Sequence, residues 1–165
     1  MDRYSSFLLM LKRNVLLAPY TTFGLGGRAR YFISVSNSAE LVEAVGLAKR
    51  ENWPYHLIAG GSNVVFDDKI FRGLIIHFAP KVKPCRRQGL TLTCAANLPL
   101  ERLIKTTIKF GLAGLETLSG IPGTVGGAIV GNAGAYGQTI SDRLARIEIF
   151  DSQLLDAARP MGRAA

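Results

Sequence analysis

The stretch LSGIPGTVGGAIVGNAGAYG, residues 118–137, is the part of the sequence from which the fold is inferred. Seven of its residues are glycine, and it contains no lysine, arginine, aspartate or glutamate. Glycine costs roughly 0.5–1 kcal/mol relative to alanine in a regular element, so this density needs a reason. The stretch therefore indicates a backbone that approaches another group closely or adopts positive φ repeatedly.

A short helix is predicted inside this stretch, over residues 125–130, with Thr124 as its N-cap. A glycine loop that leads into a helix start directs backbone N–H groups at an anion. The interpretation is a phosphate-bearing or flat aromatic ligand lying against bare backbone. The alternative is tight packing of the small residues from Gly127 to Gly131 without a ligand. The apolar run is far shorter than the ~20 residues of a membrane span, so no membrane partner is expected.

The composition is that of a basic globular chain. It has 165 residues, 48% of them hydrophobic and 19% charged, with a net charge of +8. This excess suggests anionic partners such as phosphorylated small molecules or nucleic acid. The basic residues are scattered, and the cluster Lys81, Lys83, Arg86 and Arg87 has no interleaved aromatic residue. We interpret that cluster as a solvated loop and expect no nucleic-acid partner.

Cys85 and Cys94 are the only cysteines. Their spacing matches no metal pattern and is too sparse for a disulfide framework, so no metal site is expected and a reducing cytoplasm is the inferred location. Residues 1–14 are interpreted as a helical lead-in, because the apolar run 7–11 is too short for a signal peptide.

The first half of the chain predicts a strand, a helix and a strand, over residues 29–35, 38–50 and 55–59. This order predicts a parallel pair with a right-handed crossover, its second strand short and buried. Gly60-Gly61-Ser62-Asn63 follows, where α/β sheets place ligands, and two glycines there can form an anion nest. A tight turn would look the same. Another strand is predicted over 73–78, with His77 facing solvent or satisfied in the core rather than binding a ligand.

The second half predicts a strand over 90–95, a helix over 99–110 ended by Gly111, and a strand from 143 or 144 to 150. Leu100, Leu103, Ile104, Ile108 and Phe110 are expected to face the core. No helix or strand pattern is found in the last fifteen residues.

The sequence resembles the UDP-N-acetylenolpyruvoylglucosamine reductase family in three segments: 17–27 (LAPYTTFGLGG), 58–66 (IAGGSNVVF) and 114–142 (GLETLSGIPGTVGGAIVGNAGAYGQTISD). The resemblance covers roughly residues 14–151. It implies an α+β fold of the PCMH type, with two FAD-binding subdomains over residues 15–79 and 80–151 that clasp FAD.

The resemblance also implies the residues that bind the cofactor. The loop at residues 60–63 would hold the pyrophosphate of FAD. The segment at residues 121–127 would line the flavin and the diphosphate, together with the GAYG sequence at residues 134–137. These residues are Gly60, Gly61, Ser62, Asn63, Ile121, Pro122, Gly123, Gly126, Gly127, Tyr136 and Gly137.

In that family, hydride passes from the co-substrate NADPH to the flavin and then to a nucleotide-sugar enolpyruvate, giving UDP-N-acetylmuramate for peptidoglycan synthesis. The F-x-Y-R-x-S motif that carries the family's arginine is not found here, so no catalytic residue is assigned. We expect that residues 152–165 replace the continuation of the fold through truncation or frameshift. The substrate domain is then absent, and the chain alone would not carry out the full reaction. The alternative is the FAD-binding module of another PCMH-type oxidoreductase.

Overall fold

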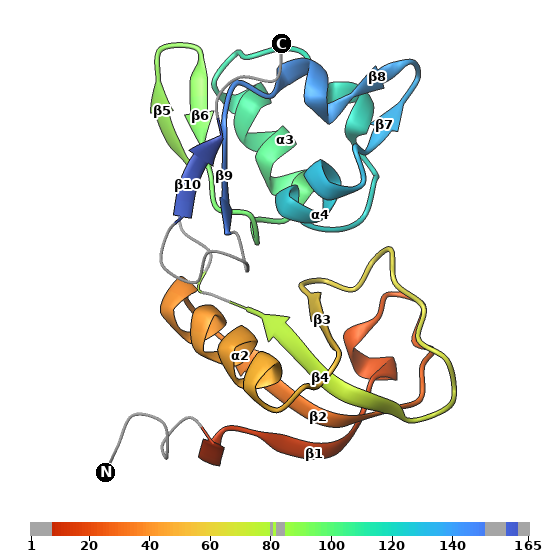
Figure 1. The fold of residues 1–165 in the computed structure, drawn as a ribbon. Coiled ribbons are helices and arrows are strands. Elements are labelled where there is room, and N and C mark those ends of the chain that lie inside the picture. The colour runs from red at the N-terminus through yellow and green to blue at the C-terminus, as the bar shows by residue number, and fades with distance from the viewer. Residues whose placement is uncertain (1–7, 80, 82–84, 151–157, 162–165) are drawn as a thin grey trace. The chain divides into compact units, whose positions relative to one another are not determined.

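The computed structural model describes residues 8–79, 81, 85–150 and 158–161 (Figure 1). The chain divides into two compact units, Met1–Lys81 and Val82–Ala165. Each unit has its own secondary structure and its own buried cluster, so each is described separately.

The first unit is a four-stranded sheet with one helix. The strands are β1 (Lys12–Leu16), β2 (Arg28–Val35), β3 (Tyr55–Ile58) and β4 (Phe71–Phe78), in the order β1-β2-β4-β3. β1 is antiparallel to β2, whereas β2 and β3 are both parallel to β4. The helix α2 (Ser38–Arg50) packs against β2 and β4, and the short 3-10 helix η1 (Ala18–Tyr20) lies between β1 and β2 in the sequence.

The predicted strand, helix and strand of this unit are confirmed, with two corrections. The first and third elements, β2 and β3, are parallel but not neighbours, because β4 lies between them. β3 is also not buried: it is the last strand of the sheet, and Leu57 is 52% exposed.

β1 was not predicted as a strand, since the lead-in was interpreted as helical to residue 14. Residues 1–7 lie outside the described part of the chain. Within β1, Asn14 has φ of +54° and no partner in the register with β2, and its carbonyl accepts a hydrogen bond of 2.7 Å from Arg28 Nη1.

Local chemistry fixes both ends of α2. Asn37 is the N-cap, and its side chain accepts a hydrogen bond of 2.9 Å from the N–H of Glu40. Lys49 and Arg50 lie in the last turn, where the helix dipole favours cations.

On the sheet, a buried cluster forms around Leu17, Ala29, Phe32, Ile58 and Ile75. Burying a large apolar side chain contributes about 1.5–3 kcal/mol, so this cluster anchors the loops that leave β3 and precede β2.

The second unit consists of short elements around a smaller core. Its hairpin strands are β5 (Arg86–Gln88) with β6 (Thr91–Thr93), and β7 (Gly134–Ala135) with β8 (Gln138–Thr139). Its helices are α3 (Leu100–Lys109), η2 (Glu116–Leu118), α4 (Val125–Val130) and η3 (Ile140–Arg143). β9 (Ile147–Phe150) pairs antiparallel with β10 (Ala158–Met161).

The core of this unit joins α3 to the glycine-rich stretch. Leu98, Leu100, Leu103, Ile104, Leu118, Val125, Ala128 and Ile140 form one buried cluster. The predicted α3 is confirmed, with Gly111 at φ of +65° after its end. Ile108 was expected in the core but is 58% exposed, because Thr107 occupies the buried position in the last turn.

Three other expectations for this unit are corrected. Arg86 and Arg87 belong to the strand β5 rather than to a loop, and Lys83 lies outside the described residues. β10 forms in a segment where no pattern was found. β6 is shorter than the predicted strand over residues 90–95. Across the described ranges, no helix is both long and apolar enough to span a membrane.

Candidate functional site

In the first unit, the predicted ligand loop Gly60–Asn63 leaves the carboxyl end of β3. Gly61 is buried with φ of +61°, a backbone conformation that glycine adopts without strain. A Cβ added at Gly61 would collide with the carbonyl oxygen of Tyr20 and lie 3.0 Å from Thr21 Cα. The Gly61 carbonyl in turn accepts a hydrogen bond of 3.1 Å from the N–H of Thr22. Position 61 therefore requires glycine for two independent reasons.

The backbone N–H groups of this loop are available as hydrogen-bond donors. In the described part of the chain, the N–H groups of Gly60, Gly61, Ser62 and Asn63 donate to no protein acceptor. Gly60 and Asn63 are exposed and Ser62 is partly exposed. Consecutive free N–H groups in a turn form an anion-binding concavity. The donor set matches the oxygen acceptors of a phosphate or diphosphate group.

A second glycine-rich loop, residues 21–27, lies against the first. The Thr21 hydroxyl donates a hydrogen bond of 2.8 Å to the Leu25 carbonyl, and the Gly27 N–H donates one of 3.0 Å to the Asp67 carbonyl. Held in this way, the loop leaves the side chains of Phe23 and Leu25 each 60% exposed. Apolar side chains exposed beside a donor-rich turn suit a ligand with a flat aromatic part. The family resemblance included this loop within residues 17–27, but its residues were not among the candidate site residues.

In the second unit, α4 begins at Thr124 as predicted. The Thr124 hydroxyl accepts a hydrogen bond of 3.2 Å from the N–H of Gly127. The N–H of Val125 donates to the Leu98 carbonyl at 2.8 Å, and that of Gly126 donates to the Ala96 carbonyl at 2.7 Å. The expectation that this helix start directs those N–H groups at an anion is therefore wrong, because each already has a protein acceptor.

The physical reason is the close approach of α4 to the chain that leads into α3. A Cβ added at Gly126 would lie 2.9 Å from the Cβ of Ala96 and 3.0 Å from its carbonyl oxygen. Close packing is thus found at Gly126, whereas it was considered for the residues from Gly127 to Gly131, where an added Cβ meets nothing closer than 3.4 Å. The N–H groups of Gly123 and Thr124 have no acceptor among the described residues, so the ligand interpretation stays a prediction for them.

The turn before α4 depends on positive φ. Gly120 and Gly123 have φ of +84° and +126°. The carboxylate of Glu101 accepts hydrogen bonds from the Gly120 N–H at 3.4 Å and the Ser119 hydroxyl at 3.2 Å. These bonds, with Lys105 beside them, lower the pKa of Glu101, the Gly120 N–H having the largest effect. Ile121 is half-buried and Pro122 is exposed, so Pro122 projects from a fixed turn.

The remaining candidate pair, Tyr136 and Gly137, forms the two-residue turn between β7 and β8. Their φ values of +52° and +77° are those of a type I′ turn, the tight connection that matches strand twist. The side chain of Tyr136 is 92% exposed. On β8, Gln138 accepts a hydrogen bond of 3.0 Å from the Thr117 hydroxyl, which holds the hairpin against η2. Tyr136 is therefore an exposed aromatic ring on an ordered turn.

His77 Nδ1 lies 3.3 Å from the Ser34 hydroxyl, and its ring centroid is 5.2 Å from that of Tyr20. Burial lowers the pKa of His77, so the ring is mainly neutral at pH 7. This confirms that His77 is satisfied within the fold. Among the residues that the structure describes, no three His, Cys, Asp or Glu side chains gather as a metal site would require.

Sequence comparison identifies the family to which these loops belong. The family described as "FAD binding domain" matches residues 29–153, which is most of the chain and includes both candidate loops and the Tyr136–Gly137 turn. The chain belongs to the FAD binding domain family. FAD is the cofactor of this family, and the free N–H groups at Gly60–Asn63 fit its diphosphate oxygens. The exposed apolar side chains beside that loop fit its aromatic rings.

Individual relatives in the FAD binding domain family carry a consistent name. The chain is 37% identical over 143 residues to a UDP-N-acetylenolpyruvoylglucosamine reductase of Synechococcus sp. (strain JA-3-3Ab), covering 87% of this chain and 46% of that protein. It is 41% identical over 135 residues to a reductase of the same name from Streptomyces coelicolor, covering 82% of this chain and 35% of that protein. The resemblance inferred from the three motifs is thereby confirmed.

The fold has a solved counterpart. The crystal structure of UDP-N-acetylenolpyruvylglucosamine reductase from Thermus caldophilus superimposes with a TM-score of 0.69 at 32% identity, over 86% of this chain and 50% of that one. The predicted α+β FAD-binding fold is therefore confirmed. The chain therefore spans about half of the Synechococcus and Thermus proteins and about a third of the Streptomyces protein.

Proposed function

We propose that this chain is the FAD-binding part of a UDP-N-acetylenolpyruvoylglucosamine reductase. The observation that carries the proposal is the run of four N–H groups at Gly60–Asn63 that have no acceptor among the described residues, held by Gly61, where the backbone of Tyr20 leaves no room for a Cβ. The relatives that share this name support the choice of reaction.

Within this proposal, the candidate residues contribute in different ways. Gly60, Gly61, Ser62 and Asn63 donate backbone hydrogen bonds to the diphosphate of FAD. Gly123 donates in the same manner, because its N–H has no acceptor among the described residues. Gly127 offers bare Cα surface rather than a donor, since its N–H group is bonded to the Thr124 hydroxyl. Gly126 contributes indirectly, because the lack of a side chain lets α4 pack against Ala96.

Apolar and aromatic groups cover the rest of the cofactor. Ile121 and Pro122 supply apolar contact from a turn fixed by the positive φ of its glycines. Tyr136 and Gly137 supply an exposed ring and a bare turn. These residues bind FAD and orient it, and no proton-transfer or hydride-accepting role falls to them.

Bound FAD supplies hydride transfer, with NADPH as the co-substrate and a UDP-sugar enolpyruvate as the acceptor. The same proposal assigns the protein to peptidoglycan synthesis, and so to cell shape and division, in the cytoplasm. The complete reaction is proposed for proteins of the full family length, because the chain spans about half of the relatives named above.

A second candidate is the FAD-binding module of another PCMH-type oxidoreductase. The two candidates differ in one assay: NADPH oxidation that depends on UDP-N-acetylglucosamine enolpyruvate belongs only to the first.

Cofactor binding is tested with the full chain and FAD. After mixing and gel filtration, the protein peak is expected to retain the visible flavin absorbance. In ¹⁵N-correlation spectra, the amide signals of Gly60–Asn63 and Gly123 should shift more on FAD addition than the occupied amides of Val125 and Gly126. Flavin that elutes entirely with the small molecules, with no amide shifts, would overturn the proposal.

A further inference from the structure

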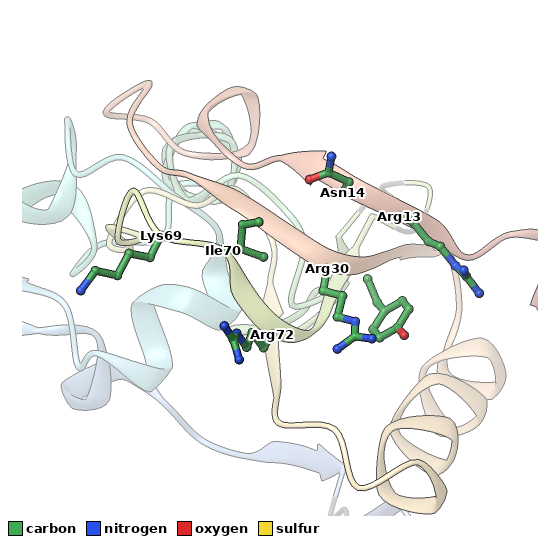
Figure 2. Close-up of a pocket in the computed structure, with 7 residues that line it drawn as sticks. Arg13, Asn14, Arg30, Lys69, Ile70 and Arg72 are labelled. Carbon is green, nitrogen blue, oxygen red and sulfur yellow. The ribbon is translucent and has the colours of Figure 1, made fainter.

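A basic cavity of about 760 Å³ lies on the first unit (Figure 2). Four cationic side chains line it: Arg13, Arg30, Lys69 and Arg72. Arg13, Arg30 and Arg72 come from the neighbouring strands β1, β2 and β4, and Lys69 lies just before β4. None of the lining residues belongs to the loops 21–27 or Gly60–Asn63. The cavity is therefore a feature distinct from the residues proposed to hold FAD.

Within the described ranges, the four cations have no anionic partner. No carboxylate lines the cavity, and none of the four side chains forms an ion pair with a described residue. Asp67 precedes Lys69, but its carboxylate accepts a hydrogen bond of 2.9 Å from the Lys69 backbone N–H. Figure 2 shows the Lys69 and Arg13 side chains extending toward opposite ends of the cavity, with Arg30 and Arg72 between them. Because like charges repel, an anion that binds among them relieves an unfavourable interaction.

Two of the guanidinium groups are positioned by an aromatic pair. The Tyr31 ring stacks on Trp53 with centroids 3.8 Å apart and planes 16° apart. The guanidinium carbons of Arg30 and Arg13 lie 5.3 Å and 5.9 Å from the Tyr31 centroid. Positioned guanidinium groups lose less conformational entropy on binding oxyanions and suit phosphate geometry. Trp53 stacks on one face of the Tyr31 ring, so that face is closed to a nucleobase.

We infer that this cavity binds a small ligand through a chain of two or three phosphate groups. A terminal phosphate carries about −1.5 to −2 charge near pH 7, so such a chain is comparable in charge to the four cations. The volume falls within the range of about 300–1,000 Å³ typical of small-molecule sites. Free inorganic polyphosphate and the phosphate chain of a nucleotide share this chemistry, and the experiment separates them.

The test is isothermal titration of the full chain with inorganic tripolyphosphate and, separately, with ATP, each with and without excess FAD. One-to-one binding of tripolyphosphate that FAD does not change is expected. Equal affinity for ATP shows that the phosphate chain alone is recognised, and at least tenfold tighter binding of ATP identifies a nucleotide as the source. In the variant Arg30→Gln/Arg72→Gln, tripolyphosphate should bind at least tenfold more weakly.

The matched control is Arg86→Gln/Lys109→Gln, which loses the same charge from exposed positions of the second unit that do not line the cavity. Its affinity should stay within twofold of the parent. Equal weakening in both variants, no saturable binding, or loss of binding on adding FAD would each overturn the inference. So would a single-stranded oligonucleotide that binds more tightly than either small ligand and is weakened equally in both variants.

Folding of the variants is followed by Trp53 fluorescence during urea denaturation. Removing two like charges should leave the midpoint unchanged or raise it. If the double variant unfolds at lower urea, the single variant Arg72→Gln, which keeps Arg13 and Arg30 beside the Tyr31 ring, should still weaken tripolyphosphate binding. Unchanged binding in that variant would also overturn the inference.

Discussion

Replacing Gly61 with alanine should destabilise the first unit by about 2–5 kcal/mol. An alanine at this positive φ costs about 1–2 kcal/mol. The added methyl group would also overlap the backbone of Tyr20 and Thr21, and overpacking a buried site costs typically about 1–3 kcal/mol more. Gly24 provides the matched control, because it lies in the same unit at φ of +65° with no atom within 4 Å of an added Cβ. Gly24→Ala should therefore show only the first cost.

The measurement is urea denaturation followed by fluorescence. Trp53 is the only tryptophan of the chain, and it stacks on Tyr31 within the first unit, so its emission reports the unfolding of that unit. With a urea dependence of about 1–3 kcal/mol per molar, the midpoint of Gly61→Ala should fall below that of Gly24→Ala by about 1 M. Equal midpoints for the two variants would refute the argument that Tyr20 excludes a side chain at position 61.

Three further predictions concern the second unit. Thr124→Ala should destabilise it by about 1 kcal/mol through loss of the α4 N-cap, as measured by thermal unfolding, whereas Thr124→Ser should restore stability. Gly126→Ala should destabilise the unit by about 1–3 kcal/mol, because the added Cβ would overlap Ala96. Gly127→Ala should be neutral or stabilising by up to about 1 kcal/mol, since its Cβ would meet nothing closer than 3.4 Å. A Gly127→Ala variant that is less stable than Gly126→Ala would contradict the packing argument. Burial, together with Cys85, raises the pKa of Cys94 to about 11, so iodoacetamide should modify Cys94 slowly at pH 8. The folded state favours the neutral Cys94 thiol, so Cys94 stabilises the fold below the ordinary cysteine pKa, and this stabilisation is lost as the pH rises to about 11. A Cys94→Ser variant should lack that pH dependence of stability.

The elements with strong local signals were predicted from the sequence. Thr124, the predicted N-cap, caps α4 because its side-chain oxygen reaches the N–H group three residues ahead, a contact that depends only on nearby residues. The glycine loops were found for a similar reason. Gly61 and Gly123 occupy positive φ, and a dense run of such residues is visible without any knowledge of the fold.

Features that depend on distant parts of the chain were not predicted. Strand propensity says nothing of which strands become neighbours, so the insertion of β4 between β2 and β3 could not be inferred. The acceptors of the α4 N–H groups, at Ala96 and Leu98, lie about 30 residues away in sequence and were missed for the same cause. The cations of the cavity come from separate strands, and only the sheet order brings Arg13 and Arg72 to one surface.

The left-handed residue in the outermost strand has a consequence for how the protein behaves at high concentration. A regular strand at the border of a sheet is a template onto which another molecule can add, and such addition leads to fibrils or precipitates. Asn14 interrupts that template, and the basic residues Lys12 and Arg13 repel an approaching copy. The irregularity in β1 thus favours a chain that stays dispersed in solution.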